Sequence, residues 1–106
     1  GEKELRAMKP SAYLVDIGRG GVVQHDALIE ALQENRLAGA ALDVFPEEPL
    51  PSTSPLWRMP NVLMSPHIAG ISPHYPDRAV ALFCDNLTRY LSGQPLLNRY
   101  DLSLRY

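Results

Sequence analysis

The stretch Tyr13–Val23, YLVDIGRGGVV, joins an apolar run to a turn with three glycines in four residues. The run Ala12–Ile17 is bounded by a Lys-Pro-Ser segment on one side and by Gly18 on the other, which is typical of a short buried strand. A glycine-rich turn directly after a strand is also where a phosphate-binding loop begins in dinucleotide-binding folds. The rest of the chain decides between that loop and another use of the glycines.

The glycine spacing departs from the dinucleotide fingerprint, G-x-G-x-x-G between a strand and a helix. Gly18 and Gly20 match its first two positions, but Val23 occupies the third. Asp43, which follows the next apolar run, only imitates the acid that contacts the ribose in such folds. A direct phosphate loop is therefore disfavoured, and a flexible strand exit without a ligand is the simpler alternative.

The order strand, helix, strand, long loop, strand, helix predicts an α/β fold with a mostly parallel sheet. Three strands make a thin sheet, and nearly continuous apolar strands need helices on both faces. We therefore expect the second half of a Rossmann-like doubly wound sheet, followed by a C-terminal helix and tail. The expected elements are strands at Ala12–Ile17, Ala38–Phe45 and Asn61–Ser65, a helix capped by Asp26 and running to about Glu34, an irregular loop with five prolines at 46–60, and a helix opened by Ser72 and Pro73 and ended by Gly93.

Both expected helices have an apolar face at helical spacing. In the first, Leu28, Ala31 and Leu32 share the core face, while Glu30 and Glu34 point outward. In the second, we expect a core face that includes a non-reactive cysteine. The tail at 94–106 is apolar enough to dock, without a predicted partner. The face of the second helix consists of Ala79, Val80, Phe83, Cys84, Leu87, Tyr90 and Leu91.

Composition places the 106-residue chain among ordinary globular domains, with 45% hydrophobic and 21% charged residues. The formal net charge of −2 gives no basic surface for nucleic acid or for an anionic membrane. No apolar run approaches the roughly 20 residues that span a bilayer. The single cysteine favours a reducing, cytoplasmic setting. Because the chain starts at Gly1 in charged, helix-like sequence, we expect it to be cut from a longer polypeptide.

Charged side chains follow the ends of all three predicted strands. Arg19 comes after the first strand, Asp43 and Glu48 come after the second, and His67 comes after the third. In an open parallel sheet these ends line one crevice, which is where ligands bind. Arginine can hold a carboxylate through two parallel hydrogen bonds, and a carboxylate beside a histidine favours its protonated form. A surface ion pair between Arg19 and Glu48 is the structural alternative.

Three blocks, in order along the chain, resemble one known family. They are MKPSAYLVDIGRGGVVQHDALIEAL, LAGAALDVFPEEPL and SPLWRMPNVLMSPHIAG. Together they are similar to the second half of the cofactor domain in the D-isomer-specific 2-hydroxyacid dehydrogenases, and the similarity covers roughly residues 3–101. The segments SPLW, SPHY and NLTRYLSGQPLLN resemble the glyoxylate and hydroxypyruvate reductase branch.

The resemblance implies three catalytic residues: Arg19 in DIGRG, Glu48 in DVFPEEP and His67 in PHIAG. His67 would donate a proton to the carbonyl oxygen of a small-molecule 2-oxo acid, Glu48 would keep His67 protonated and oriented, and Arg19 would bind the substrate carboxylate. The family also implies NAD or NADP as cofactor and a homodimer, and Asp43 would accept a hydrogen bond from the nicotinamide amide. The glycines of the turn then serve the nicotinamide end and not the phosphates. The implied cofactor-binding residues are Ile17, Gly18, Arg19, Asp43, His67, Ile68, Ala69 and Gly70.

Two departures from the family pattern carry consequences. Asp16 stands where the family usually has asparagine, and its carboxylate could compete for Arg19. The G-x-G-x-x-G turn, the acid that reads the ribose and most of the substrate domain are missing, and in the family they lie upstream. We therefore expect residues 1–106 to be the C-terminal portion of a dinucleotide-binding domain, which by itself binds cofactor weakly and does not turn over.

The other candidates have structural interpretations. His25 and His74 are expected to be solvated, and no spacing of His, Cys, Asp or Glu predicts a metal site. Trp57 and Met59 are expected to cover the core below the proline-rich loop, with contact between Trp57 and substrate as the alternative.

Two other functions stay open. The parent protein could be a non-catalytic regulator or scaffold that binds nicotinamide cofactor. Alternatively, the chain could be an inactive remnant that self-associates through exposed apolar faces.

Overall fold

The computed structural model describes residues 1–103 and divides the chain into two compact units, Gly1–Gly70 and Ile71–Tyr106. The predicted docking tail at 94–106 is described only as far as Ser103, and residues 104–106 lie outside the described residues. Each unit is taken by itself below. None of the helices in the described part of the chain has the length and hydrophobicity of a membrane span.

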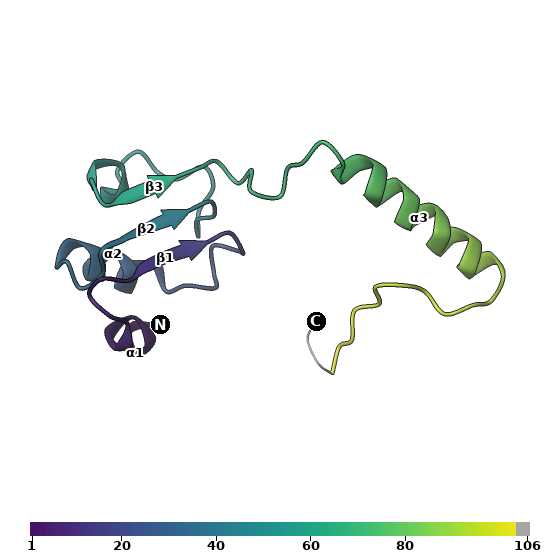
Figure 1. Cartoon of the computed structure of the whole chain (residues 1–106), viewed down its shortest axis with the longest axis horizontal. Coiled ribbons are helices and arrows are strands. Elements are labelled where there is room, and N and C mark those ends of the chain that lie inside the picture. Colours follow the sequence, from purple (N-terminus) through teal and green to yellow (C-terminus); the bar gives the residue numbers. More distant parts are fainter. Residues whose placement is uncertain (104–106) are drawn as a thin grey trace. The chain divides into compact units, whose positions relative to one another are not determined.

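The first unit is built on a three-stranded parallel sheet in the order β1-β2-β3, as Figure 1 shows. Its strands are β1 (Tyr13–Asp16), β2 (Gly39–Leu42) and β3 (Val62–Met64). In the register, Asp16 lies opposite Leu42, which lies opposite Met64, so all three strands end at one edge. The predicted parallel α/β arrangement is confirmed.

Strand β2 is shorter than the predicted strand Ala38–Phe45, because the backbone near the end of that prediction bonds to a loop residue and not to a neighbouring strand. The Asp43 amide still donates to the Asp16 carbonyl at 2.9 Å, but the Phe45 amide donates to the Glu48 carboxylate at 2.9 Å instead of to a neighbouring strand. A backbone group that binds a side chain cannot extend the sheet ladder. The predicted strand therefore ends at Leu42.

One helix covers one face of this sheet. Helix α2 (His25–Gln33) buries Leu28, Ala31 and Leu32, as predicted, against the inward side chains of the strands. The expected cap at Asp26 is wrong, because the helix begins two residues earlier than that cap implies and Gln24 is its N-cap. Asp26 instead lies in the first turn, where a negative charge favours the helix dipole. Asn35 follows the helix in the left-handed conformation, with φ of 54°, which asparagine adopts more readily than most residues with a side chain.

The remaining elements of the first unit close its core from the sides. Helix α1 (Glu2–Ala7), which was not among the expected elements, inserts Leu5 next to α2. The proline-rich loop is not wholly irregular, because η1 (Pro55–Arg58) forms a 3-10 turn whose N-cap, Ser54, accepts a hydrogen bond from the Leu56 amide. Proline tolerates this position because its missing N–H would be unpaired in a first helical turn. Leu56 is buried there, and the predicted packing of Met59 against the core is confirmed.

The opposite face of the sheet is apolar and exposed. Tyr13, Val15 and Leu63 point away from α2 and are 66–75% exposed. A strand pair that buries alternate residues on one face presents the others on the second face. A sheet with one covered and one bare apolar face is what half of a doubly wound domain would have.

The second unit consists of helix α3 (Tyr75–Leu91) and the tail that follows it. The helix begins at Tyr75 and not at Ser72, and Pro76 lies in its first turn. Gly93, with φ of 66°, ends it as predicted. The expected core face is wrong within this unit, because no residue of α3 is buried and Cys84 is exposed. Within residues 71–103, the tail folds back on the helix, where the Asn86 side chain accepts from the Leu97 amide at 2.7 Å.

Candidate functional site

The strand ends bring three of the predicted site residues to the same edge of the sheet. Asp43 follows β2 and is tied to the end of β1 by its amide. The His67 amide, after β3, donates to the Asp43 carbonyl at 2.9 Å. Arg19 follows β1 within the same unit. The prediction that these residues meet at the carboxyl edge is therefore confirmed at the level of the backbone.

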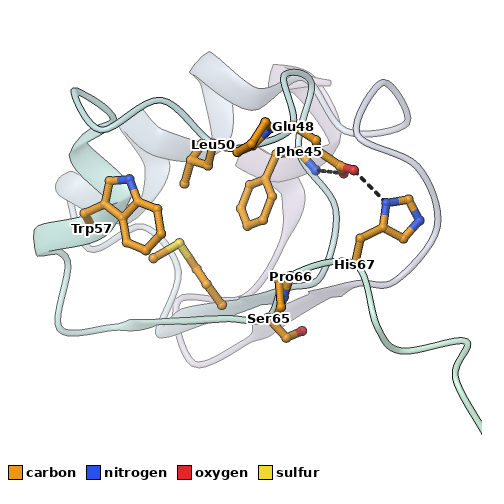
Figure 2. A pocket seen from close by; sticks show the side chains of 9 residues that line it. Phe45, Glu48, Leu50, Trp57, Ser65, Pro66 and His67 are labelled. Atoms are coloured by element: carbon orange, nitrogen blue, oxygen red, sulfur yellow. Dashed lines mark hydrogen bonds and ion pairs between the residues drawn. The ribbon is translucent and has the colours of Figure 1, made fainter.

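A hydrogen-bonded pair formed by Glu48 and His67 is the best-defined feature of this edge. Glu48 Oε2 lies 2.7 Å from His67 Nδ1, and Glu48 Oε1 accepts from the Phe45 amide at 2.9 Å (Figure 2). Hydrogen bonding by His67, and then by the Phe45 amide, holds the pKa of Glu48 below its ordinary value of 4.5. Glu48 is therefore a carboxylate at neutral pH.

The pair fixes which imidazole nitrogen is available for chemistry. A carboxylate can only accept, so Nδ1 carries the proton that faces Glu48. Nε2 is then the nitrogen that can give or take a proton, and Figure 2 shows it directed away from Glu48 and from the cavity behind the pair. This arrangement is that of a general acid oriented by a carboxylate.

Asp43 holds the loop that carries His67. Its carboxylate is 3% exposed, and it accepts from the Ile68 amide at 2.9 Å, from the Ala69 amide at 2.8 Å and from the Ser65 hydroxyl. Hydrogen bonding by Ser65 is the main cause that lowers the pKa of Asp43, and the two amides and the nearby His67 add to it. His67 has φ of 55°, which is uncommon for a residue with a side chain. The buried Asp43 carboxylate therefore supports a backbone turn that the chain would otherwise adopt rarely.

Arg19 is exposed on the turn after β1. Its Nη1 donates to the carbonyl of Gly18 at 2.7 Å. The expected competition by Asp16 is not seen among residues 1–103, because the Asp16 carboxylate is buried and accepts from the Gly18 amide at 3.0 Å. No hydrogen bond or ion pair within the described residues joins Arg19 to Glu48 or His67. The guanidinium therefore keeps donors for an external partner.

The glycines of the opening turn have different surroundings. A Cβ on Gly20 would lie 2.0 Å from the Phe45 carbonyl oxygen, whereas one on Gly21 would meet nothing within 4 Å. The Val22 amide donates to the Arg19 carbonyl at 2.9 Å, so these two glycines are the central residues of one turn. The expectation that the glycines of the turn serve the nicotinamide end stays a prediction, and the missing side chain of Gly20 also makes room for the chain's own backbone.

An apolar cavity of about 450 Å³ lies behind the Glu48–His67 pair. Figure 2 shows Trp57, Leu50 and Phe45 around it, on the side of the pair opposite to Nε2. The expectation that Trp57 covers the core is wrong, because Trp57 is 55% exposed and its Nε1 donates to the Pro51 carbonyl at 3.0 Å. Contact of Trp57 with substrate stays a prediction.

A smaller hollow of about 170 Å³ lies on the bare side of the sheet at its carboxyl edge. Ile17, Asp43 and Ala69, three of the predicted cofactor-binding residues, contribute to its lining. Among the described residues, the one donor to Asp43 Oδ2 is the Ala69 amide. Because a carboxylate oxygen can accept twice, Oδ2 can take a further donor such as an amide group. The residues present thus fit a flat ring with a carboxamide.

The predictions for His25, for His74 and for a metal site have different outcomes. The expectation that His25 is solvated is wrong, because its ring packs edge-on against Phe45 at 6.0 Å between centroids, and burial lowers its pKa. His74 is exposed, as predicted. Among residues 1–103, no group of three His, Cys, Asp or Glu side chains could hold a metal ion.

Sequence reasoning missed two residues that shape the site, Phe45 and Ser65, whereas it had already singled out Gly20 as a glycine of the turn. Phe45 acts through its backbone amide, which carries no sequence signal. Ser65 ends the third predicted strand, and its position level with Asp43 on the neighbouring strand was the one available signal.

Comparison with known proteins agrees with this geometry. The family described as D-isomer specific 2-hydroxyacid dehydrogenase, NAD binding domain, matches residues 1–69. Glyoxylate reductase of Thermofilum pendens is 44% identical over 107 residues, which cover 98% of this chain and 32% of that protein. Glyoxylate/hydroxypyruvate reductase B of Pectobacterium carotovorum is 49% identical over 94 residues, covering 89% and 29%.

Solved structures show the same fold. A D-isomer specific 2-hydroxyacid dehydrogenase from Xanthobacter autotrophicus, in complex with NADPH and MES, superposes with a TM-score of 0.93 at 40% identity over 100% of this chain and 43% of that one. An NADPH-dependent glyoxylate/hydroxypyruvate reductase from Sinorhizobium meliloti, in complex with NADP and sulfate, gives a TM-score of 0.86 at 31% identity over 100% and 34%.

The fold is thus of the Rossmann type found in dinucleotide-binding oxidoreductases. The chain belongs to the family of D-isomer-specific 2-hydroxyacid dehydrogenases and corresponds to its NAD-binding domain. It spans about a third of the length of the curated relatives it matches.

Proposed function

We propose that this chain is the C-terminal portion of the dinucleotide-binding domain of a longer NAD- or NADP-dependent D-2-hydroxyacid dehydrogenase. The reaction is hydride transfer between the nicotinamide and a 2-hydroxy or 2-oxo acid. The single observation that carries the proposal is the Glu48–His67 pair, with Glu48 Oε2 at 2.7 Å from Nδ1 and the other carboxylate oxygen fixed by Phe45. A surface ion pair would not need that second anchor.

His67 is the general acid of the proposed reduction. With Nδ1–H held by Glu48, the proton leaves from Nε2 and goes to the carbonyl oxygen of the 2-oxo acid, which becomes the hydroxyl. The Glu48 carboxylate stabilises the imidazolium before transfer and keeps the ring oriented. In the reverse direction, neutral His67 accepts the hydroxyl proton at Nε2.

Arg19 binds the carboxylate of the substrate. Its guanidinium can donate two parallel hydrogen bonds to a carboxylate, a geometry that lysine does not offer. Holding the carboxylate beside the histidine places the carbonyl oxygen within reach of Nε2.

The hollow beside Asp43 holds the nicotinamide end of the cofactor. Ile17 and Ala69 line it, and Asp43 Oδ2 would accept a hydrogen bond from the carboxamide. When bound, the reduced nicotinamide supplies the hydride that adds to the carbonyl carbon. Gly18, Ile68 and Gly70 complete the cofactor-binding set through their backbones.

Glyoxylate and hydroxypyruvate are the proposed substrates, because relatives that are 44% and 49% identical carry those names. The parent protein is further proposed to be a cytoplasmic homodimer. The bare apolar sheet face and the exposed apolar residues of α3 support association with further protein surface. The single exposed Cys84 suits a reducing compartment.

The test is turnover by the full-length protein, followed as loss of NADH or NADPH absorbance with glyoxylate or hydroxypyruvate. Replacing His67 by alanine should lower kcat/KM by about 10²–10⁴-fold, the usual contribution of a general acid. His74→Ala is the matched control, because that histidine is exposed in the second unit and its replacement should leave turnover unchanged.

Two results would contradict the proposal. Turnover that survives His67→Ala would remove the acid from the mechanism. A wild-type protein that binds NAD or NADP yet reduces no 2-oxo acid would favour the non-catalytic regulator. Sequencing the coding region upstream of Gly1 tests the domain assignment, since a strand followed by G-x-G-x-x-G should precede this chain.

A further inference from the structure

The turn that carries Arg19 and the loop that carries Glu48 touch at one point. A Cβ built on Gly20 would lie 2.0 Å from the carbonyl oxygen of Phe45, 2.1 Å from its carbonyl carbon and 2.5 Å from the Pro46 nitrogen. All three atoms belong to the backbone, so no side-chain rotation can relieve the overlap. The two loops therefore pack backbone against backbone, and only glycine fits between them.

Phe45 connects this contact to the Glu48–His67 pair. Its carbonyl meets Gly20, while its amide donates to Glu48 Oε1 at 2.9 Å. Phe45 is 9% exposed, and its ring packs edge-on against His25. A residue fixed in this way transmits a displacement from one loop to the other, because packed interiors do not absorb such shifts.

We propose that Gly20 is a positioning residue, whose contact with the Phe45 backbone sets the spacing between the Arg19 guanidinium and the Glu48–His67 pair. This inference rests on the function proposed above. Among residues 1–103, Arg19 has no hydrogen bond or ion pair to Glu48 or His67, so its position relative to that pair is set through the backbone, by the β1–β2 ladder and by the Gly20 contact with Phe45. A 2-oxo acid contacts the Arg19 guanidinium and the His67 imidazole at the same time, so the two groups must lie at a fixed separation.

The expected size of the effect follows from the geometry. A Cβ atom essentially never comes within 3.0 Å of a heavy atom outside its own and the neighbouring residues. An alanine at position 20 would place its Cβ 2.0 Å from the Phe45 carbonyl oxygen, so it forces the loops apart by about 1 Å. A misplacement of that size costs on the order of 10²-fold in rate when it separates groups that act together. Gly21, one residue on, has open space, so alanine there changes the backbone without moving the loops.

The experiment compares Gly20→Ala with Gly21→Ala in the full-length protein, with glyoxylate as substrate and oxalate as a carboxylate inhibitor. Gly20→Ala should raise the KM for glyoxylate and the inhibition constant of oxalate by about tenfold or more and lower kcat/KM by about 10²-fold, while the KM for the cofactor changes less. Gly21→Ala, which adds a Cβ in open space within the same turn, should raise both constants by less than Gly20→Ala does. A merely structural defect would lower kcat through a smaller folded fraction and would leave both constants for the acids unchanged.

If Gly20→Ala yields no folded protein, Pro46→Gly tests the same inference. It removes the ring that restrains the backbone against which Gly20 packs, and it adds no heavy atom. It should raise the same two constants by a smaller factor. Equal constants in the wild type and in the folded variants would overturn the inference while leaving the proposed function intact. A failure of the proposed function would instead show as a wild type without turnover.

Discussion

Replacing Glu48 by glutamine tests the proposed acid most directly, because the change keeps the shape of the side chain and removes its charge. In the structure, one carboxylate oxygen accepts from the Phe45 amide at 2.9 Å and the other faces His67 Nδ1 at 2.7 Å. Glutamine has one acceptor oxygen and one NH₂ group, so it can satisfy only one of the two. If the oxygen faces Phe45, the NH₂ group opposes a protonated Nδ1; if it faces His67, the NH₂ group opposes the Phe45 amide.

Either orientation removes part of what the acid needs. With the glutamine oxygen toward Phe45, the NH₂ group disfavours a protonated His67. With the oxygen toward His67, the side chain loses the hydrogen bond from the Phe45 amide that orients it. We expect kcat/KM for glyoxylate to fall by about 10²-fold, at the lower end of the range for general acid catalysis, because His67 itself remains. The assay is steady-state cofactor oxidation by the full-length protein. Glu47→Gln is the control, since the neighbouring Glu47 is exposed and has no hydrogen bond or ion pair among the described residues.

The double variant Glu48→Gln with His67→Ala provides the refutation. If Glu48 acts only through His67, its loss should cost nothing once the imidazole is gone, so the double variant should be as slow as His67→Ala alone. Effects that multiply would show that Glu48 acts independently of His67. The reasoning from the 2.7 Å contact would then be wrong.

Three further predictions concern the framework of the site. Asp43→Asn should speed hydrogen exchange at the Ile68 amide and lower turnover, because an amide group cannot accept at both of its ends; unchanged exchange would argue against the clamp. Leu28→Ala should lower the free energy of unfolding by roughly 3–5 kcal/mol in urea titration, since Leu28 is fully buried, whereas Gln33→Ala, at an exposed position of the same helix, should change it by less than about 0.5 kcal/mol; equal effects would contradict the assigned core. Burial lowers the pKa of His25, so the unfolded chain takes up its proton first, and stability should be full above pH 6.5 and decline as the pH falls below it; His25→Gln should reduce that decline, and a slope unchanged by the substitution would contradict it.

The sequence by itself determined the architecture of the first unit. The apolar runs around Tyr13, Ala40 and Val62 and the helical spacing of Leu28 and Leu32 are local patterns, and they predicted parallel strands with a helix between the first two. The same topology places Arg19, Asp43 and His67 at one edge, because parallel strands end together. The family resemblance then supplied candidate roles.

Only the tertiary structure decided how those residues are held. Glu48 is anchored by the Phe45 amide, His67 is held in a left-handed turn by the Asp43 carboxylate, and Gly20 is needed because the Phe45 backbone lies against it. Each of these contacts uses a backbone group that every residue type possesses, or a close approach between loops distant in sequence. Neither kind of contact produces a periodicity or a composition that can be recognised in the sequence. The spacing of the site is therefore set by packing, whereas its location is set by the order of strands and helices along the chain.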